Sequence, residues 1–299
     1  MDDIKQIKEL ADQGDPKAQY LLARHYTDKE RDSEKGGYYL RLALANDYVE
    51  ALAYVGEVLY VNNHYSQAYD YLKKAVDKNN HSSAMYYLAM MHLEGNGVAK
   101  NHVIANQLML KSANAGNKDA QTCMALSSLN GELGVEKNLQ EAEKWAIRAS
   151  GHREDLYCYT EHAYAHSVLG RIYEEMGDKL PFFRKEKKKE LYKKAEYCFL
   201  IASIRGQRDA LLNLGFLYYR GELEDKKKCL HYFALAKMYN VPNADDCLKR
   251  CSAYFEDRTE LIKYLTEEAF GSTLSMFGVE GAVVDQLCSV IVELIYDSE

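Results

Sequence analysis

The chain has 299 residues, only three of them proline, and a formal net charge of −7. Few helix breakers beside many alanine, leucine, lysine and glutamate residues favour an all-helical fold. The acidic balance argues against general nucleic-acid binding, which depends on a positive surface.

Signals for secretion or membrane insertion are missing from the sequence. Residues 1–10 (MDDIKQIKEL) lack the apolar core of a signal peptide. No apolar run reaches the ~20 residues that span a bilayer, and the best candidate, 282–296, is too short and carries Asp285 and Glu293. The seven cysteines are scattered without paired spacing, which predicts buried thiols in a reducing compartment. We therefore expect a cytoplasmic protein without a membrane span.

The predicted elements are helical hairpins built on one pattern, which is clearest in residues 210–240. Ala210, Leu214 and Tyr218 lie one turn apart on one side of a first helix, and Gly215 would let a second helix come close. The second helix begins at Cys229, after a break. A hairpin of this size buries too little apolar surface to be stable alone, so it must stack on copies of itself.

Copies of this pattern occupy most of the chain. Residues 3–14 match only a second helix, so 1–17 is expected to form an N-terminal half-repeat cap. Six full units then fill 18–240. Their first helices have position zero at Ala18, Ala51, Ala84, Ala120, Ala165 and Ala210, and their second helices begin at Gly36, Ala68, Ala105, Ala142, Ala195 and Cys229. Subtracting consecutive first-helix positions gives spacings of 33, 33, 36, 45 and 45 residues.

These residues carry a family resemblance. The pattern Ala-x3-Leu-Gly-x2-Tyr, the segment EGNGVAKN (94–101) and the pattern Ala-x2-Trp-x3-Ala (142–149) resemble Sel-one-like repeats, relatives of the tetratricopeptide repeats. The resemblance covers about residues 3–240 and implies a right-handed α-solenoid that binds proteins. It also implies a role as an adaptor or scaffold or, in bacteria, as an immunity partner of a toxin. The first two units depart from the family because they lack the glycine-rich loop.

The two longest spacings indicate insertions at about 151–161 and 176–191. The second insertion (MGDKLPFFRKEKKKEL) places Phe182 and Phe183 beside a lysine-rich run. Insertions in a solenoid emerge as loops on one face and are frequent contact points. The alternative is a solvated basic helix start whose phenylalanines fold back on the array.

The repeat pattern decays in 241–299, where we expect a divergent helical cap. Residues 243–255 fit a degenerate helix, and 258–270 fit another. The last predicted helix, 282–296, has a wide apolar face that must be buried. It either caps the open end of the solenoid or forms a homodimer or partner contact.

Candidate chemistry is sparse. Cys158, His162 and His166 share a helix face and have ligand types that suit zinc, but no fourth ligand is evident and packed histidines are commoner. A hydrolase or another metal-dependent activity there is the alternative to a binding function. The Gly95-x-Gly97 pair lacks the third glycine and the preceding strand of a dinucleotide motif, so a tight turn between helices explains it better. We predict a protein that is not an enzyme and needs no cofactor.

The binding surface can be predicted from the same register. In tetratricopeptide repeats one face of each first helix lines the concave groove, and here that face falls at positions +2, +6 and +9. Those positions are Tyr20, Arg24, Thr27, Ala53, Glu57, Tyr60, Tyr86, Met90, Leu93, Thr122, Leu126, Leu129, Ser167, Arg171, Glu174, Leu212, Phe216 and Tyr219. Aromatic residues and methionine interleaved with arginine are typical of interface hot spots. The alternative is that these side chains touch one another.

We therefore expect a non-catalytic module that holds a protein or peptide in this groove, with the 176–191 insertion closing over it. The residues expected to contact the partner are Tyr20, Arg24, Glu57, Tyr60, Tyr86, Met90, Arg171, Phe216, Tyr219, Phe182 and Phe183. The acidic chain would suit a basic partner.

Overall fold

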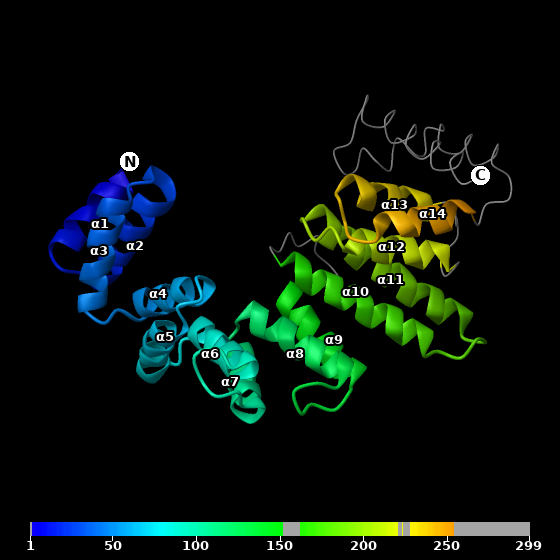
Figure 1. Ribbon diagram of the computed structural model, residues 1–299, viewed down its shortest axis with the longest axis horizontal. Coiled ribbons are helices and arrows are strands. Elements are labelled where there is room, and N and C mark those ends of the chain that lie inside the picture. Colours follow the sequence, from blue (N-terminus) through cyan, green and yellow to red (C-terminus); the bar gives the residue numbers. More distant parts are fainter. Residues whose placement is uncertain (1, 152–161, 221–222, 224–227, 254–299) are drawn as a thin grey trace. The chain divides into compact units, whose positions relative to one another are not determined.

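The computed structural model describes residues 2–151, 162–220, 223 and 228–253. These residues form only helices (Figure 1). The chain divides into two compact units, which we treat separately: unit 1 comprises 1–127 and 131–136, and unit 2 comprises 128–130 and 137–299. None of the described helices is long and apolar enough to cross a membrane.

Unit 1 contains α1, seven further α-helices and one π-helical turn. Their bounds are α1 (Asp2–Asp12), α2 (Pro16–His25), η1 (Tyr26–Glu30), α3 (Ser33–Ala45), α4 (Val49–Val61), α5 (Tyr65–Asn79), α6 (Ser82–Glu94), α7 (His102–Asn114) and α8 (Lys118–Asn130), the last three residues of which belong to unit 2. The pairs α2–α3, α4–α5 and α6–α7 pack together, and α1 packs on α2. Helix α1 lies within 1–17, the range predicted for the half-repeat cap.

The helices described in unit 2 continue the series. They are α9 (Leu139–Ser150), α10 (Ala163–Asp178), α11 (Lys185–Ile204), α12 (Ala210–Tyr219), α13 (Lys228–Met238) and α14 (Ala244–Ala253). The pairs α10–α11 and α12–α13 pack together, and α14 packs on α13. Helix α14 lies within the degenerate helix predicted at 243–255. The helices predicted at 258–270 and 282–296, and the homodimer contact, lie outside the described residues.

The repeat register places small residues where helices meet. All six first-helix alanines at position zero are at most 3% exposed. The residues seven positions into each second helix are 0% exposed in every repeat: Ala43, Ala75, Ser112, Ala149, Ala202 and Ala236. Since the same offsets are buried in all six copies, the predicted repeat and its register are confirmed.

Glycines at position +5 allow the two helices of a hairpin to approach closely. A Cβ on Gly56 would lie 2.6 Å from Cγ of Leu72, and a Cβ on Gly170 would lie 2.6 Å from Cε1 of Phe199. Leu72 and Phe199 occupy the same position of their second helices, four residues after its start. The close helix approach predicted from these glycines is therefore present in both units.

Tyrosines at position +8 pack on the second helix in two other repeats. The ring of Tyr26 stacks on Tyr39 with centroids 5.8 Å apart, and Tyr218 stacks on Tyr232 with centroids 5.6 Å apart. Tyr39 and Tyr232 both stand three positions into the second helix. Part of the high tyrosine content is thus explained by packing within the repeat.

The EGNGVAKN segment is a turn between α6 and α7. Gly95 and Gly97 have φ values of 82° and 72°, which favour glycine. The side chain of Asn101 accepts hydrogen bonds from the backbone N–H groups of Val103 and Ile104, both at 3.1 Å, and so caps α7. The prediction that these glycines form a tight turn between two helices is confirmed.

The 176–191 insertion differs from the expected loop. Its first residues belong to α10 and its last seven to α11, so most of it lengthens two helices, and only 179–184 is a turn. The lysine-rich run favours helix, which explains this outcome. The other insertion, 151–161, lies outside the described residues except for Gly151, where α9 ends.

The cysteine prediction is wrong for one pair. Cys229 and Cys251 are joined as a disulfide between α13 and α14, while Cys123, Cys198 and Cys247 are free thiols. The paired cysteines are 22 residues apart and meet only because α14 packs on α13. Local spacing could not reveal that contact.

Candidate partner-binding surface

The first cluster on the predicted binding face joins α2 to α4. The Tyr20 ring lies 6.2 Å from that of Tyr54, edge to face, and the Arg24 guanidinium lies over the Tyr54 ring at 4.7 Å. Arg24 also pairs with Asp28 at 2.8 Å. The hydrogen bond to Asp28 is the largest cause of the raised pKa of Arg24. The Arg24 guanidinium is therefore always charged, and its charge is already paired with that of Asp28.

The second cluster joins α4 to α6. The hydroxyl of Tyr87 donates to Glu57 at 2.8 Å, and that of Tyr60 donates to Glu94 at 2.9 Å. The rings of Tyr60 and Tyr87 are 5.2 Å apart, and Tyr86 meets Tyr87 at the same distance. All three rings remain half-buried rather than covered. We call Tyr20, Tyr54, Tyr60, Tyr86 and Tyr87, with the charged residues beside them, the tyrosine face of unit 1.

The tyrosine face is acidic. Burial, followed by the hydrogen bond to Glu94, raises the pKa of Tyr60 to about 12, and burial also raises the pKa of Tyr86 and Tyr87. The phenols are therefore neutral donors at physiological pH, whereas Glu57 and Glu94 contribute negative charge. With the charge of Arg24 matched by Asp28, the face carries a net negative charge.

The sequence left two expectations for this face: a surface open to a partner, or side chains that touch one another. Tyr20, Arg24, Glu57, Tyr60 and Tyr86 do touch neighbouring side chains, as the alternative held, but they remain partly exposed. Met90 is also half-buried, on α6. Four other predicted positions are wrong, because they are at most 6% exposed and present no surface: Ala53, Thr122, Leu129 and Ser167.

Tyr54 and Tyr87 on this face were not predicted from the sequence. Both stand at position +3, one turn before position +6 and therefore on the same side of the helix. The recurrence of tyrosine at the same offset in two consecutive repeats could have indicated these positions from the sequence. The cross-helix contacts to Arg24 and Glu57 could be seen only in the structure.

The predicted residues in unit 2 form a different surface. Phe216 is 36% exposed and packs edge to face on Phe233, with centroids 5.2 Å apart, and Arg171 is exposed. Tyr219 is half-buried on α12. Glu174 forms an ion pair with Arg220, and burial raises the pKa of the Glu174 carboxyl. No aromatic cluster like that of unit 1 is described at these positions.

Phe182 and Phe183 do not fold back on the helices. They are 83% and 68% exposed in the turn between α10 and α11. Their rings contact each other edge to face, with centroids 5.8 Å apart. The alternative expectation for these two residues is therefore wrong, although the basic helix start that it included is present at Lys185.

The metal hypothesis gains no support from the described residues. His162 precedes α10 and is half-buried, and His166 is 1% exposed within α10. Cys158 lies outside the described residues. Among those that are described, no group of three His, Cys, Asp or Glu side chains could hold a metal ion.

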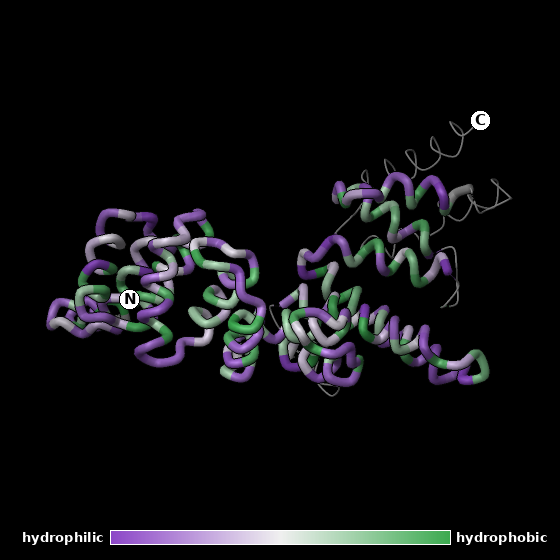
Figure 2. Tube along the Cα trace, turned by 60° about the horizontal axis from the view of Figure 1, so that its bottom comes forward, coloured by the Kyte–Doolittle hydropathy of each residue, from purple (hydrophilic) through white to green (hydrophobic). Residues whose placement is uncertain are grey.

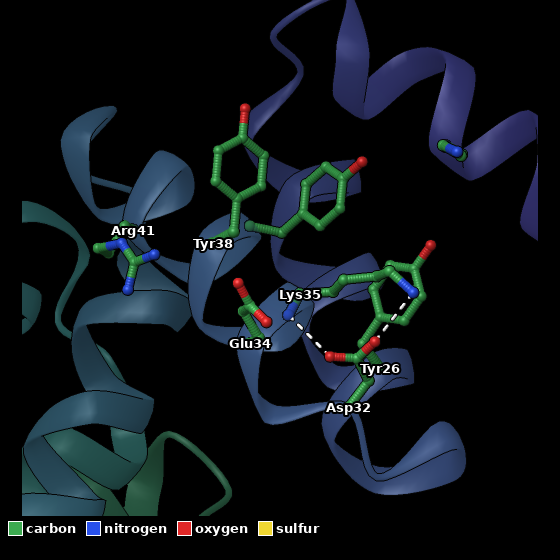
Figure 3. A pocket seen from close by; sticks show the side chains of 8 residues that line it. Tyr26, Asp32, Glu34, Lys35, Tyr38 and Arg41 are labelled. Atoms are coloured by element: carbon green, nitrogen blue, oxygen red, sulfur yellow. Dashed lines mark hydrogen bonds and ion pairs between the residues drawn. The ribbon is translucent and has the colours of Figure 1, made fainter.

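A pocket of about 490 Å³ lies between α1, η1 and α3 in unit 1 (Figure 3). Its lining mixes charges of both signs with three tyrosines: Lys8, Tyr26, Asp32, Glu34, Lys35, Tyr38, Tyr39 and Arg41. Lys35 is bonded to Asp32 at 2.9 Å and lies over the Tyr26 ring. Because Lys35 and Asp32 are already paired with each other, the pocket is a weaker candidate than the tyrosine face.

The buried alanines, the close glycine contacts and the paired helices define an all-helical repeat protein of the α-solenoid class. The Sel1 repeat model matches residues 16–48, 50–80, 82–117, 119–151 and 208–238. The chain belongs to the Sel1 repeat family, which is related to the tetratricopeptide repeats. The fifth predicted unit, which contains the 176–191 insertion, is not among the matched segments.

Solved structures support the same fold. A Sel1 repeat protein from Oxalobacter formigenes is 21% identical, with a TM-score of 0.56 over 75% of this chain and 86% of its own. A protective antigen present in uropathogenic Escherichia coli strains, which displays an SLR fold, is 18% identical, with a TM-score of 0.50 over 99% of this chain and 72% of its own. No curated protein shows significant similarity to the chain.

Proposed function

We propose that the chain is a non-catalytic protein-binding module whose partner lies on the tyrosine face of unit 1. Sel1 repeats generally mediate protein–protein interaction. The observation that carries the proposal is the half-buried tyrosine cluster that continues from α2 through α4 to α6. Tyrosine offers a large contact area with few rotatable bonds and is enriched at interfaces.

The charge of the tyrosine face favours a partner segment that carries lysine or arginine. A cation can lie over a tyrosine ring, as Arg24 does over Tyr54 within the chain, and gain the attraction of the ring. Glu57 and Glu94 supply carboxylates close to Tyr60 and Tyr87. Opposite charges speed the encounter and select the partner.

The biological role we propose is that of an adaptor or of a toxin-neutralising immunity protein in the bacterial cytoplasm. Both roles need one stable protein contact and no chemistry. This part of the proposal rests on the family resemblance, whereas the position of the surface rests on contacts within unit 1.

A pull-down with the immobilised full chain tests the surface. Partners held by the wild type are expected to be lost by Tyr54→Ala/Tyr87→Ala and by Glu57→Gln/Glu94→Gln, which removes charge but retains hydrogen-bond acceptors. The matched control is Tyr38→Ala/Val103→Ala, because these side chains are 52% and 68% exposed outside the tyrosine face. Thermal melting of each variant verifies folding. If every partner is retained by both face variants, the proposed surface is wrong.

A further inference from the structure

The end of the α10–α11 hairpin is an exposed apolar turn. In Figure 2 this turn is coloured hydrophobic and stands at the end of the hairpin. Phe182 and Phe183 are the two most exposed phenylalanines among the described residues, and their rings contact each other. The N–H of Arg184 donates to the carbonyl of Pro181 at 2.9 Å, which closes the turn. We call residues 179–189 (KLPFFRKEKKK) the hairpin tip.

Contacts below the tip hold the two helices together. Tyr192 is 1% exposed, and a Cβ on Gly177 would lie 2.7 Å from its ring. The Tyr192 hydroxyl donates to Asp178 at 2.7 Å. The base of the hairpin is thus tightly packed, and the phenylalanine pair is held away from the core of the unit.

The tip is strongly cationic in an acidic chain. It contains six lysine or arginine residues and a single glutamate, whereas the whole chain has a net charge of −7. The carboxylates next to it have partners: Glu175 pairs with Lys137 and Lys179, and Glu190 pairs with Lys194 at 3.2 Å. Arg184, Lys185 and Lys187 are exposed.

From this arrangement we propose that the hairpin tip docks on an anionic lipid surface. The two phenylalanines enter the interface between headgroups and acyl chains, and the surrounding cations bind the headgroup phosphates and carboxylates. Two signals are needed for stable attachment to a membrane surface, and an apolar wedge with a basic cluster supplies both.

The shape of the tip favours a lipid surface over a protein. Hot spots of protein interfaces fill well-packed pockets within a patch of roughly 800 Å² per partner, and a two-residue turn offers much less area. A bilayer needs no matching pocket. Long lysine side chains can keep their charges at the headgroups while aromatic rings are buried beside them. This docking is independent of the tyrosine face in unit 1.

Vesicle sedimentation with the full chain tests the proposal. Vesicles of phosphatidylcholine with about a third phosphatidylserine are expected to sediment the wild type, and pure phosphatidylcholine vesicles are not. Lys185→Gln/Lys187→Gln should weaken binding by about 30-fold, since each basic residue near the surface contributes about fivefold. Phe182→Ser/Phe183→Ser should weaken it at least tenfold. Added salt should weaken the binding of the wild type.

Matched controls change equivalent groups elsewhere. Lys73→Gln/Lys74→Gln removes two exposed charges from α5, and Ile204→Ser removes a side chain that is 52% exposed at the end of α11. Both controls should bind vesicles like the wild type. In a Trp145→Phe/Phe182→Trp variant, the new tryptophan emission should shift to shorter wavelength on anionic vesicles.

Three results would overturn the proposal. The first is no sedimentation of the wild type with anionic vesicles, and the second is equal binding by the wild type and both tip variants. The third is that the tip variants lose binding to a single-stranded oligonucleotide or to an acidic protein while vesicle binding is unchanged. Because the altered side chains are exposed, melting temperatures should stay at the wild-type value, so lost binding cannot be attributed to unfolding.

Discussion

The ring of Phe199 on α11 packs against Gly170 on α10 so closely that a Cβ at Gly170 would stand 2.6 Å from Cε1 of the ring. Gly56 and Leu72 repeat this relationship between α4 and α5 in unit 1. A helix-interior glycine is otherwise unfavourable by roughly 1 kcal/mol relative to alanine. The close approach of the second helix therefore accounts for glycine at position +5.

Gly170→Ala is expected to lower the free energy of unfolding by about 1–3 kcal/mol, because overpacking outweighs the gain in helix propensity. Gly37→Ala in α3 is the matched control, since the nearest atom to its Cβ would be the Nη1 of Arg41 at an ordinary 3.5 Å. That control should raise stability by up to ~1 kcal/mol. Urea unfolding measures both changes, and stabilisation by Gly170→Ala would contradict the packing argument.

Asn101→Ala should cost about 1 kcal/mol of stability, because two backbone N–H groups at the start of α7 lose their acceptor. Asn138 caps α9 in the same way, accepting from Gln140 and Glu141. Asn101→Ala and Asn138→Ala would lie in different units, so their effects on the free energy of unfolding should add. Asn101→Asp retains an acceptor and should cost little. An equal loss for Asn101→Ala and Asn101→Asp would rule out capping as the cause.

The fold was predictable because its signal repeats. Each copy placed alanine at position zero, so six weak observations combined into one register, and burial of all six alanines confirms it. The tyrosine face was only partly predictable. Tyr60 and Glu57 stand on the predicted side of α4, but their partners Glu94 and Tyr87 come from α6. Local periodicity does not specify which side chains meet across two helices.

Two features depended on information that no single segment contains. Phe182 and Phe183 are exposed because α10 and α11 extend on both sides of them, and an apolar pair in the sequence does not reveal whether its helices continue that far. The pairing of Cys229 with Cys251 likewise follows from the packing of α14 on α13.

His231 should make unfolding pH-dependent. Burial, and then the charge of Lys228, lower its pKa to about 4, whereas an unfolded histidine has a pKa of about 6.5. The neutral ring therefore stabilises the fold above pH 6.5, and as pH falls toward 4 the unfolded chain takes up a proton that the folded chain does not. By linkage this removes up to about 3 kcal/mol from the free energy of unfolding.

Chemical unfolding of the wild type and of His231→Leu, measured at intervals between pH 7 and pH 4, checks this. Leucine keeps an apolar side chain in the buried site without a titrating group, so the variant should lose less stability over the range. The two curves would run parallel if the imidazole of His231 were protonated equally in both states, and that result would refute the assignment.

The hydrogen bond between Tyr87 and Glu57 should couple α4 to α6 energetically. Tyr87→Phe and Glu57→Gln are each expected to lower stability, and a double-mutant cycle should give a coupling of about 1 kcal/mol, as for a partly exposed bond to a carboxylate. Tyr69→Phe, on α5 and without a described hydroxyl bond to Glu57, serves as the control and should show no coupling with Glu57→Gln. A coupling near zero for Tyr87 would mean that the bond does not persist in solution. If the bond does orient the ring, Tyr87→Phe should weaken partner binding less than Tyr87→Ala, because phenylalanine keeps the ring that we propose as a partner contact and loses only the hydroxyl that bonds Glu57.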